Sequence, residues 1–451
     1  MEHLTGSRDR FERLRQNGIP LYPARCWRTH AVAQTLLPGV TDVVLAGRLT
    51  LMDADSGTAV LADASGRIPL YAPPSITACW TDLASDDIVE CAGTVQNGVL
   101  RLHELRLLVP SLSPAPETIP TASVVLRANM LSHIRRFFDT RGFIGVDTPT
   151  FMTVPDLTPA LVSFRTIYRD DAGKTVPLYL QTSPEHYMKR LLAAGYERIY
   201  QLCRFYRNGE RFSVHNPEFT GLEWYEAYTD SYGVMQTTQE LVASMAVALN
   251  QTHLLNYRGR TIDLSPPWPR VTVRDTFLTN AGIDLDGCEA MADFREQAVA
   301  GGFETRDNDT WDDLFYRIFT QAVEPALPAD RPVFVTEYPA QLPSLARCVP
   351  GNDRYVERFE LYIGGLELAN AFTELNDPVE QGRRFETQRE LKILLEGYPG
   401  GVDEALLAAL AYGMPPSGGI ALGVDRLLML FADAAHIDEV LPFVPLHDKK
   451  P

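Results

Sequence analysis

Lysine is scarce in this sequence. Lysine and arginine number 41 together, and only five are lysine: Lys174, Lys189, Lys392, Lys449 and Lys450. Arginine therefore carries nearly all of the positive charge, and genomic base composition is a sufficient explanation. The six cysteines form no C-x-x-C pair, which argues against a zinc site or a disulfide framework and fits a reducing cytosol.

Long apolar runs and two common nucleotide-binding motifs are absent as well. No run of 18 apolar residues predicts a transmembrane helix, and the charged first residues lack the apolar core of a secretory signal. We therefore expect a cytoplasmic protein without a membrane partner. Neither G-x-G-x-x-G nor G-x-x-x-x-G-K-[ST] occurs, which argues against a Rossmann or P-loop site. The net charge of −17 opposes non-specific binding to nucleic acid but allows a local basic patch.

A stretch rich in proline and serine, residues 110–123, divides the chain. Before it, residues 7–18 have the pattern of an amphipathic helix, and five short alternating runs follow. Five strands at this spacing predict a small closed barrel of the OB type, with a tight hairpin at Asn97-Gly98. We predict a helix plus OB-like barrel at residues 1–112, a linker at 113–123 and a larger domain at 124–451.

The larger domain has the pattern of the α+β class. Long strands separated by hairpin-like loops predict an antiparallel sheet, and helical stretches between them predict flanking helices. The strands are expected within residues 143–152, 176–182, 198–207, 218–228, 331–339, 356–372 and 418–426. The helices are expected near residues 124–142, 185–195, 232–250, 310–325 and 379–396.

Charged side chains interrupt the predicted strands between residues 181 and 228. Arg204, Arg207, Glu218 and Glu223 stand in otherwise apolar runs. A charge on a buried strand is costly unless it is paired or meets a ligand. For any one of these residues an internal salt bridge is the simpler interpretation, but the set together favours a pocket for a polar ligand.

Three glutamates follow one another at intervals of seven: Glu360, Glu367 and Glu374. An odd interval puts successive members on opposite faces of a regular strand. Gly364 and Gly365 would permit a turn or bulge that resets the register. Two carboxylates brought together in this way would suit Mg²⁺ on a nucleotide triphosphate, whereas spacing alone equally fits solvated carboxylates at a sheet edge.

A third block, residues 415–432, is a glycine-rich strand that turns into an apolar helix. Arg426 at that turn would suit a phosphate. No nucleophile with an adjacent base accompanies these acidic groups and arginines. The three blocks therefore predict phosphate chemistry by positioning and charge neutralisation.

These motifs resemble class II aminoacyl-tRNA synthetases of the lysine type over most of residues 124–446. Pro149 after a helix and strand resembles the first class motif, RFYRNGERFSVHNPEFTGLEWYEAY the second, and GGIALGVDRLLMLF the third. The resemblance implies an antiparallel sheet of six to seven strands, a homodimer, and formation of an adenylate from ATP with Mg²⁺. The catalytic part is most similar to the elongation factor P lysine ligase, which lacks an N-terminal barrel.

The resemblance also implies roles for individual residues. As catalytic residues, Arg207 would bridge the amino acid carboxylate and the α-phosphate, and Arg426 would hold the γ-phosphate. ATP would be bound by Arg207, Asn208, His215, Asn216, Phe219, Glu367, Leu368, Gly423 and Arg426. A lysine-like amino acid would be bound by Ser183, Glu185, Glu223, Tyr225, Asn370, Phe372, Glu374 and Ala421. Mg²⁺ would be held by Glu360 and Glu367.

Several positions depart from the pattern of the synthetase. Ser183 and Ala421 match the protein-lysine ligase instead, and Ala371 replaces a glycine, which predicts a narrower pocket. Gly209 replaces the glutamate that reads adenine, and the adjacent Glu210 is expected to point elsewhere. In the barrel, Pro69 replaces an anticodon-reading glutamine, and no aromatic residue is evident near residues 58–61.

Three hypotheses follow. The first is a ligase that activates lysine or a lysine-like amino acid and passes it to an amine on a protein or a small molecule, with tRNA disfavoured. The second is a divergent lysyl-tRNA synthetase. The third is an inactive regulator that binds a ligand through the same fold.

Overall fold

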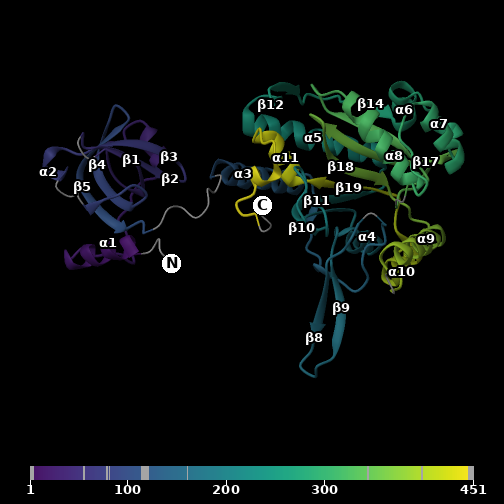
Figure 1. The fold of residues 1–451 in the computed structure, drawn as a ribbon, viewed down its shortest axis with the longest axis horizontal. Helices are drawn as coiled ribbons and strands as arrows, with labels where there is room; N and C mark the ends of the chain where they lie inside the picture. The colour runs from purple at the N-terminus through teal and green to yellow at the C-terminus, as the bar shows by residue number, and fades with distance from the viewer. Residues whose placement is uncertain are drawn as a thin grey trace. The chain divides into compact units, whose positions relative to one another are not determined.

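The computed structural model describes residues 5–53, 56–77, 80, 82–112, 121–159, 161–342, 345–397 and 400–444 (Figure 1). The chain forms two compact units, Met1–Ile119 and Pro120–Pro451. Most of the predicted linker, residues 113–120, lies outside the described part. Residues 121–123 belong to the first turn of helix α3 (Thr121–Asp139). No helix in the described ranges has the length and apolar character needed to span a membrane.

The first unit is a five-stranded barrel with a helix at its start. The strands close in the order β1-β2-β3-β5-β4, and apolar side chains such as Leu45, Leu61 and Leu100 alternate into its core. Asn97 and Gly98, both with positive φ, form the hairpin between β4 and β5, as predicted. The elements are α1 (Thr5–Gln16), η2 (Val32–Leu36), β1 (Asp42–Asp53), β2 (Thr58–Asp63), β3 (Gly66–Tyr71), α2 (Pro74–Thr77), β4 (Ile88–Gln96) and β5 (Val99–Val109).

The second unit is built on a nine-stranded sheet, which confirms the predicted α+β class. The order is β14-β15-β17-β18-β19-β11-β10-β6, with β16 paired to β17. Short strands at its margins make it wider than the six to seven strands implied by the resemblance. The strands are β6 (Ile144–Gly145), β10 (Arg198–Tyr206), β11 (Glu218–Ala227), β14 (Arg270–Thr272), β15 (Val333–Pro339), β16 (Cys348–Val349), β17 (Asn352–Ile363), β18 (Leu366–Thr373) and β19 (Ser417–Gly423).

Smaller elements surround the sheet (Figure 1). Two further sheets contain β7 (Phe151–Met152), β8 (Arg165–Arg169) and β9 (Thr175–Leu180), and β12 (Leu254–Tyr257) and β13 (Arg260–Asp263). The longer helices are α4 (Glu185–Ala193), α5 (Ser231–Asn250), α6 (Val273–Ala281), α7 (Met291–Ala300), α8 (Trp311–Ile318), α9 (Pro378–Glu396), α10 (Glu404–Gly413) and α11 (Val424–Phe431). The short helical turns are η4 (Leu285–Gly287), η5 (Phe319–Val323), η6 (Glu324–Ala326) and η7 (Ile437–Val440).

One face of the sheet packs on helices α3, α5 and α11. Leu222, Trp224, Ile420 and Phe359 point to this side and join the helices in the largest apolar cluster. Ala371 belongs to the same cluster and is fully buried. The expectation that Ala371 narrows the pocket is therefore wrong, because side chains alternate along a strand and residue 371 faces the core.

The turn between β17 and β18 brings two glutamates onto one face. Gly364 and Gly365 both have positive φ, the backbone region that glycine adopts without strain. Directly after the turn, the register shifts by one residue, so that Glu360 pairs with Asn370 while Tyr362 pairs with Glu367. This bulge resets the alternation as the glycines suggested, and Glu360 and Glu367 therefore share a face.

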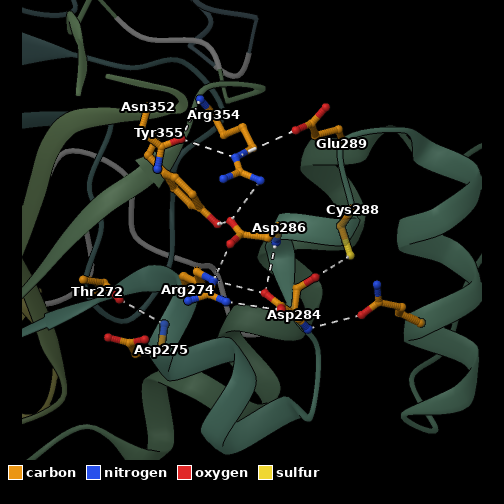
Figure 2. A network of polar contacts seen from close by, with 11 residues as sticks. Thr272, Arg274, Asp275, Asp284, Asp286, Cys288, Glu289, Asn352, Arg354 and Tyr355 are labelled. Carbon is orange, nitrogen blue, oxygen red and sulfur yellow. Dashed lines mark hydrogen bonds and ion pairs between the residues drawn. The ribbon is translucent and has the colours of Figure 1, made fainter. Parts of the chain in front are cut away.

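A polar network holds the beginning of β17 against the neighbouring helices (Figure 2). Tyr355 donates a hydrogen bond to Asp286, 2.8 Å, and Arg274 forms ion pairs with Asp284 and Asp286 at 3.1 and 2.9 Å. Arg354 lies 3.8 Å from Asp286. These contacts fix the strand that carries Arg358 and Glu360 into the site.

Candidate active site

A cavity of about 510 Å³ lies over the sheet face opposite the α3–α5–α11 core. Its floor consists of cross-strand rows. In one row Glu223, Ala421, Asn370 and Glu360 are successive partners, and in the next Tyr225, Gly419, Phe372 and Arg358 are. Side chains in such rows point to the same side of a sheet. The sheet register thus gathers residues that lie up to 200 positions apart in the chain.

Glu223 is the most distinctive polar group in the floor of this cavity. Its side chain is buried, and Oε1 accepts a hydrogen bond from the Tyr225 hydroxyl at 2.6 Å. Within the described residues Oε2 has no hydrogen-bond partner. Burial, and then the nearby Glu185 carboxylate, raise the pKa of Glu223 well above its usual value. A buried carboxylate with a free oxygen is well suited to a cationic ligand.

Glu185 and Glu374 are joined by an internal cation. Lys189 Nζ lies 2.5 Å from Glu185 Oε1 and 2.6 Å from Glu374 Oε2. Glu185 lines the cavity, whereas Glu374 lies just behind it, with Oε1 against the backbone of Gly419. A Cβ at position 419 would lie 2.2 Å from that oxygen, so glycine is required for this close approach.

Glu360 and Glu367 form a carboxylate pair in another part of the cavity. Glu360 is buried and accepts hydrogen bonds from Arg358, Tyr338 and Tyr362 at 2.6, 2.6 and 2.7 Å. Burial, and then the Glu367 carboxylate, raise the pKa of Glu360. The described residues contain no cluster of three or more metal-binding side chains. Two oxygen donors nevertheless fit Mg²⁺ that takes its other ligands from phosphates and water.

Arg426 marks the nucleotide end predicted from the sequence. Its guanidinium contacts the Glu367 carbonyl oxygen at 2.7 Å, the Glu367 carboxylate at 3.3 Å and His215 Nε2 at 2.5 Å. Burial, and then the arginine charge, lower the pKa of His215 to about 4. His215 is therefore neutral at neutral pH, and its Nε2 accepts from Arg426.

Arg207 and Phe219 lie together near the turn that follows β10. The Arg207 guanidinium stands over the Phe219 ring at 5.3 Å, and its only ion pair among the described residues is a 3.9 Å contact with Glu210. Glu210 lines the cavity. Gly209 adopts a φ of +87° in the intervening turn, a conformation that favours glycine.

The remaining predicted site residues fall into two groups. Ser183, Asn216, Leu368 and Gly423 line the cavity, and Asn216 is buried with its amide donating to the Glu218 carbonyl. Asn208 is exposed and lies outside the described lining. The inclusion of Arg204 and Glu218 in the pocket is wrong, because they form a half-exposed ion pair at 3.6 Å and do not line the cavity.

Sequence reasoning missed several residues of the site. Lys189 and Arg358 are charged residues within apolar segments, the same signal that identified Glu223. A second group of missed residues lies on α8 and the helical turns that follow it. The sequence of this segment predicted a helix but gave no sign that it lines a cavity. These cavity-lining residues are Tyr316, Phe319, Thr320 and Glu324.

The sheet is antiparallel except at its two margins. With helices on one face and a cavity of carboxylates and arginines on the other, it defines a catalytic unit of the class II synthetase kind. Residues 119–446 match the family model described as tRNA synthetases class II (D, K and N), and the chain belongs to this family.

Full-length relatives are named Lysine--tRNA ligase. The chain is 34% identical to that of Pelotomaculum thermopropionicum, over 97% of this chain and 93% of the relative. It is 35% identical to that of Moorella thermoacetica, over 91% and 89%, and 30% identical to that of Bacillus subtilis, over 99% and 98%.

These relatives overturn the expectation of an acceptor other than tRNA. The similarity extends through the barrel as well as the catalytic unit, and the relatives are named for tRNA. The error has a physical origin. Ser183 and Ala421 line the cavity, in the part predicted to hold the amino acid, so they bear on the choice of amino acid and not on the acceptor.

Proposed function

We propose that this chain is an ATP-dependent ligase that activates lysine and transfers it to tRNA. The observation that carries the proposal is the buried Glu223 carboxylate in the cavity floor. Its Oε1 accepts a hydrogen bond from Tyr225, whereas its Oε2 is unpaired within the described residues. A desolvated ammonium group is a compact three-donor cation that needs such an oxygen. The names of the full-length relatives support lysine as amino acid and tRNA as acceptor.

Two steps fit the groups in the cavity. A carboxylate oxygen of lysine attacks the α-phosphorus of ATP, the bond from that phosphorus to the bridging oxygen breaks, and pyrophosphate leaves. The terminal ribose hydroxyl of tRNA then attacks the carbonyl carbon of the adenylate, and AMP leaves. In this proposal Arg207 would hold the carboxylate against the α-phosphate and Arg426 would hold the distal phosphates, so that the protein acts by positioning and charge stabilisation.

Glu360 and Glu367 would hold Mg²⁺, which neutralises phosphate charge when it is bound. Phe219 would stack on the adenine, with His215 and Asn216 beside the nucleotide. Glu210 would take the place left by Gly209 at the adenine edge. Support for this role is the position of Glu210 in the cavity wall.

The barrel is proposed to be an OB-type domain that contacts the tRNA. Support comes from its strand order, β1-β2-β3-β5-β4, and from an exposed aromatic. Tyr71 on β3 is the direct partner of Thr58 on β2, and Arg101 lies over its ring at 5.3 Å. An aromatic ring with an arginine beside it suits the stacking of a base. The homodimer and the likeness of the catalytic part to the protein-lysine ligase stay predictions.

The test is lysine-dependent exchange of pyrophosphate into ATP, followed by charging of a lysine tRNA transcript. We expect both activities, and we expect Tyr71→Ala to weaken charging while leaving the exchange reaction unchanged. An inactive ligand-binding regulator would give neither activity. Exchange without charging would contradict tRNA as the acceptor.

A further inference from the structure

The scarce lysines are concentrated in the interior. Of the three lysines in the described residues, Lys189 and Lys392 are among the largest fully buried side chains. Arginine serves almost everywhere else in this chain. A lysine ammonium is compact and its charge is concentrated at one point, whereas a guanidinium is a flat, wide fork. At positions 189 and 392, therefore, the buried cation is a compact ammonium group and not a guanidinium.

Lys189 stands among three carboxylates. It bridges Glu185 on its own helix and Glu374 after β18, and its Nζ lies 5.1 Å from the centre of the Phe372 ring. Glu223 on β11 interacts electrostatically with all three of these charged groups. Other titratable groups near the cluster are Tyr225, also on β11, and Cys203 on β10 beside Glu223. On α4 itself, His186 interacts with Glu185 and pairs with Asp403 at 2.9 Å. The facing segment of β19 contributes glycines and Ala421.

We propose that Lys189 is a positioning residue that neutralises one of these three carboxylates and so matches the pocket to a substrate with two ammonium groups. The inference rests on the proposed function and assigns to Lys189 the charge balance of its amino acid site. Three carboxylates with one internal cation leave two uncompensated negative charges. The two ammonium groups of a diamino acid complete the balance, whereas an amino acid with a neutral side chain leaves one buried charge unpaired, which is costly.

The charge count determines how binding depends on pH. Burial raises the pKa of Glu374 to about 8, and the Lys189 ammonium opposes that rise. Without Lys189 the carboxyls would hold their protons more tightly, by about 1–3 pH units for a close opposite charge. The substrate would then have to displace a proton up to a higher pH than in the unchanged enzyme. Its affinity would fall, and would recover about tenfold for each unit of rising pH.

The experiment measures the KM for lysine in pyrophosphate exchange between pH 7 and 9, with lysine binding by calorimetry as a second readout. In the unchanged enzyme we expect KM to level off near pH 8. In Lys189→Met we expect KM at pH 7 to rise at least about tenfold and still to be falling at pH 9. Lys392→Met is the matched control, because Lys392 is equally buried and bonds to the Thr158 and Leu161 carbonyls. The Lys392→Met substitution should leave the pH dependence of KM for lysine unchanged.

A second variant separates charge balance from folding. Lys189→Met combined with Glu374→Gln removes both members of the buried pair, which proteins tolerate better than the loss of one member. It leaves two carboxylates for two ammonium groups, so the upward shift seen in Lys189→Met should disappear and KM should again level off by about pH 8. An unshifted profile in a folded Lys189→Met enzyme, or a double variant whose profile stays shifted, would overturn the inference. Failure of the proposed function is distinct, because the unchanged enzyme would then show no exchange with lysine.

Discussion

The two ends of the cavity are built in different ways. At the proposed amino acid end, Glu223 and Tyr225 are buried in cross-strand rows of the sheet, and Glu374 is buried behind the cavity. At the nucleotide end, Arg207, His215 and Phe219 are half-buried and lie on or beside the loop between β10 and β11. The sheet holds the buried side chains of the first end in fixed positions, whereas the positions of the side chains at the second end depend on the conformation of a loop. We therefore expect substitutions at one end to change KM for lysine and substitutions at the other end to change KM for ATP.

The largest effect is expected where the two ends meet. Arg207→Ala removes the cation that is proposed to contact both the amino acid carboxylate and the α-phosphate. Charge stabilisation of this kind is worth about 10³-fold in rate, so we expect kcat/KM in pyrophosphate exchange to fall about 10³-fold for lysine and for ATP alike. A loss confined to one of the two substrates would contradict the bridging role.

The next largest effect should be confined to the amino acid end. Glu223→Gln removes a buried carboxylate and leaves the substrate ammonium without its counter-charge, so KM for lysine should rise about 100-fold while KM for ATP stays within about twofold. Glu226→Gln is a matched control. Glu226 is buried on the same strand, but it faces α5 and accepts a hydrogen bond from Thr237 at 2.7 Å. Equal effects from both substitutions would show that Glu223 serves stability alone.

The two ends should also differ in their response to pH. Burial raises the pKa of Glu374 to about 8 and that of Glu223 well above its usual value. Below these values the carboxyls carry protons that an incoming ammonium must displace, so KM for lysine should fall about tenfold as pH rises from 7 to 8.5. His215 is neutral throughout that range, since its pKa is lowered to about 4. KM for ATP, measured in the same assays, should change little.

The contrast also explains what the sequence could predict. Glu223 was recognisable because a charge in an apolar strand is costly without a partner. The shared face of Glu360 and Glu367 depended on a bulge that Gly364 and Gly365 suggested but could not locate. The sequence did not identify Lys189 as part of the site. The ion pair of Lys189 with Glu374, 185 residues away, arises from tertiary packing that no local pattern encodes.

The smallest effect is expected at the nucleotide end. Phe219→Leu keeps an apolar side chain but removes the ring proposed to stack on adenine, and aromatic stacking is worth about 1 kcal/mol. We expect KM for ATP to rise about fivefold and KM for lysine to remain unchanged. Phe212→Leu in the same loop is the control, because Phe212 is exposed and does not line the described cavity. An effect of Phe219→Leu on lysine as large as that on ATP would mean that the ends are coupled through β11, and the independence inferred from the structure would be lost.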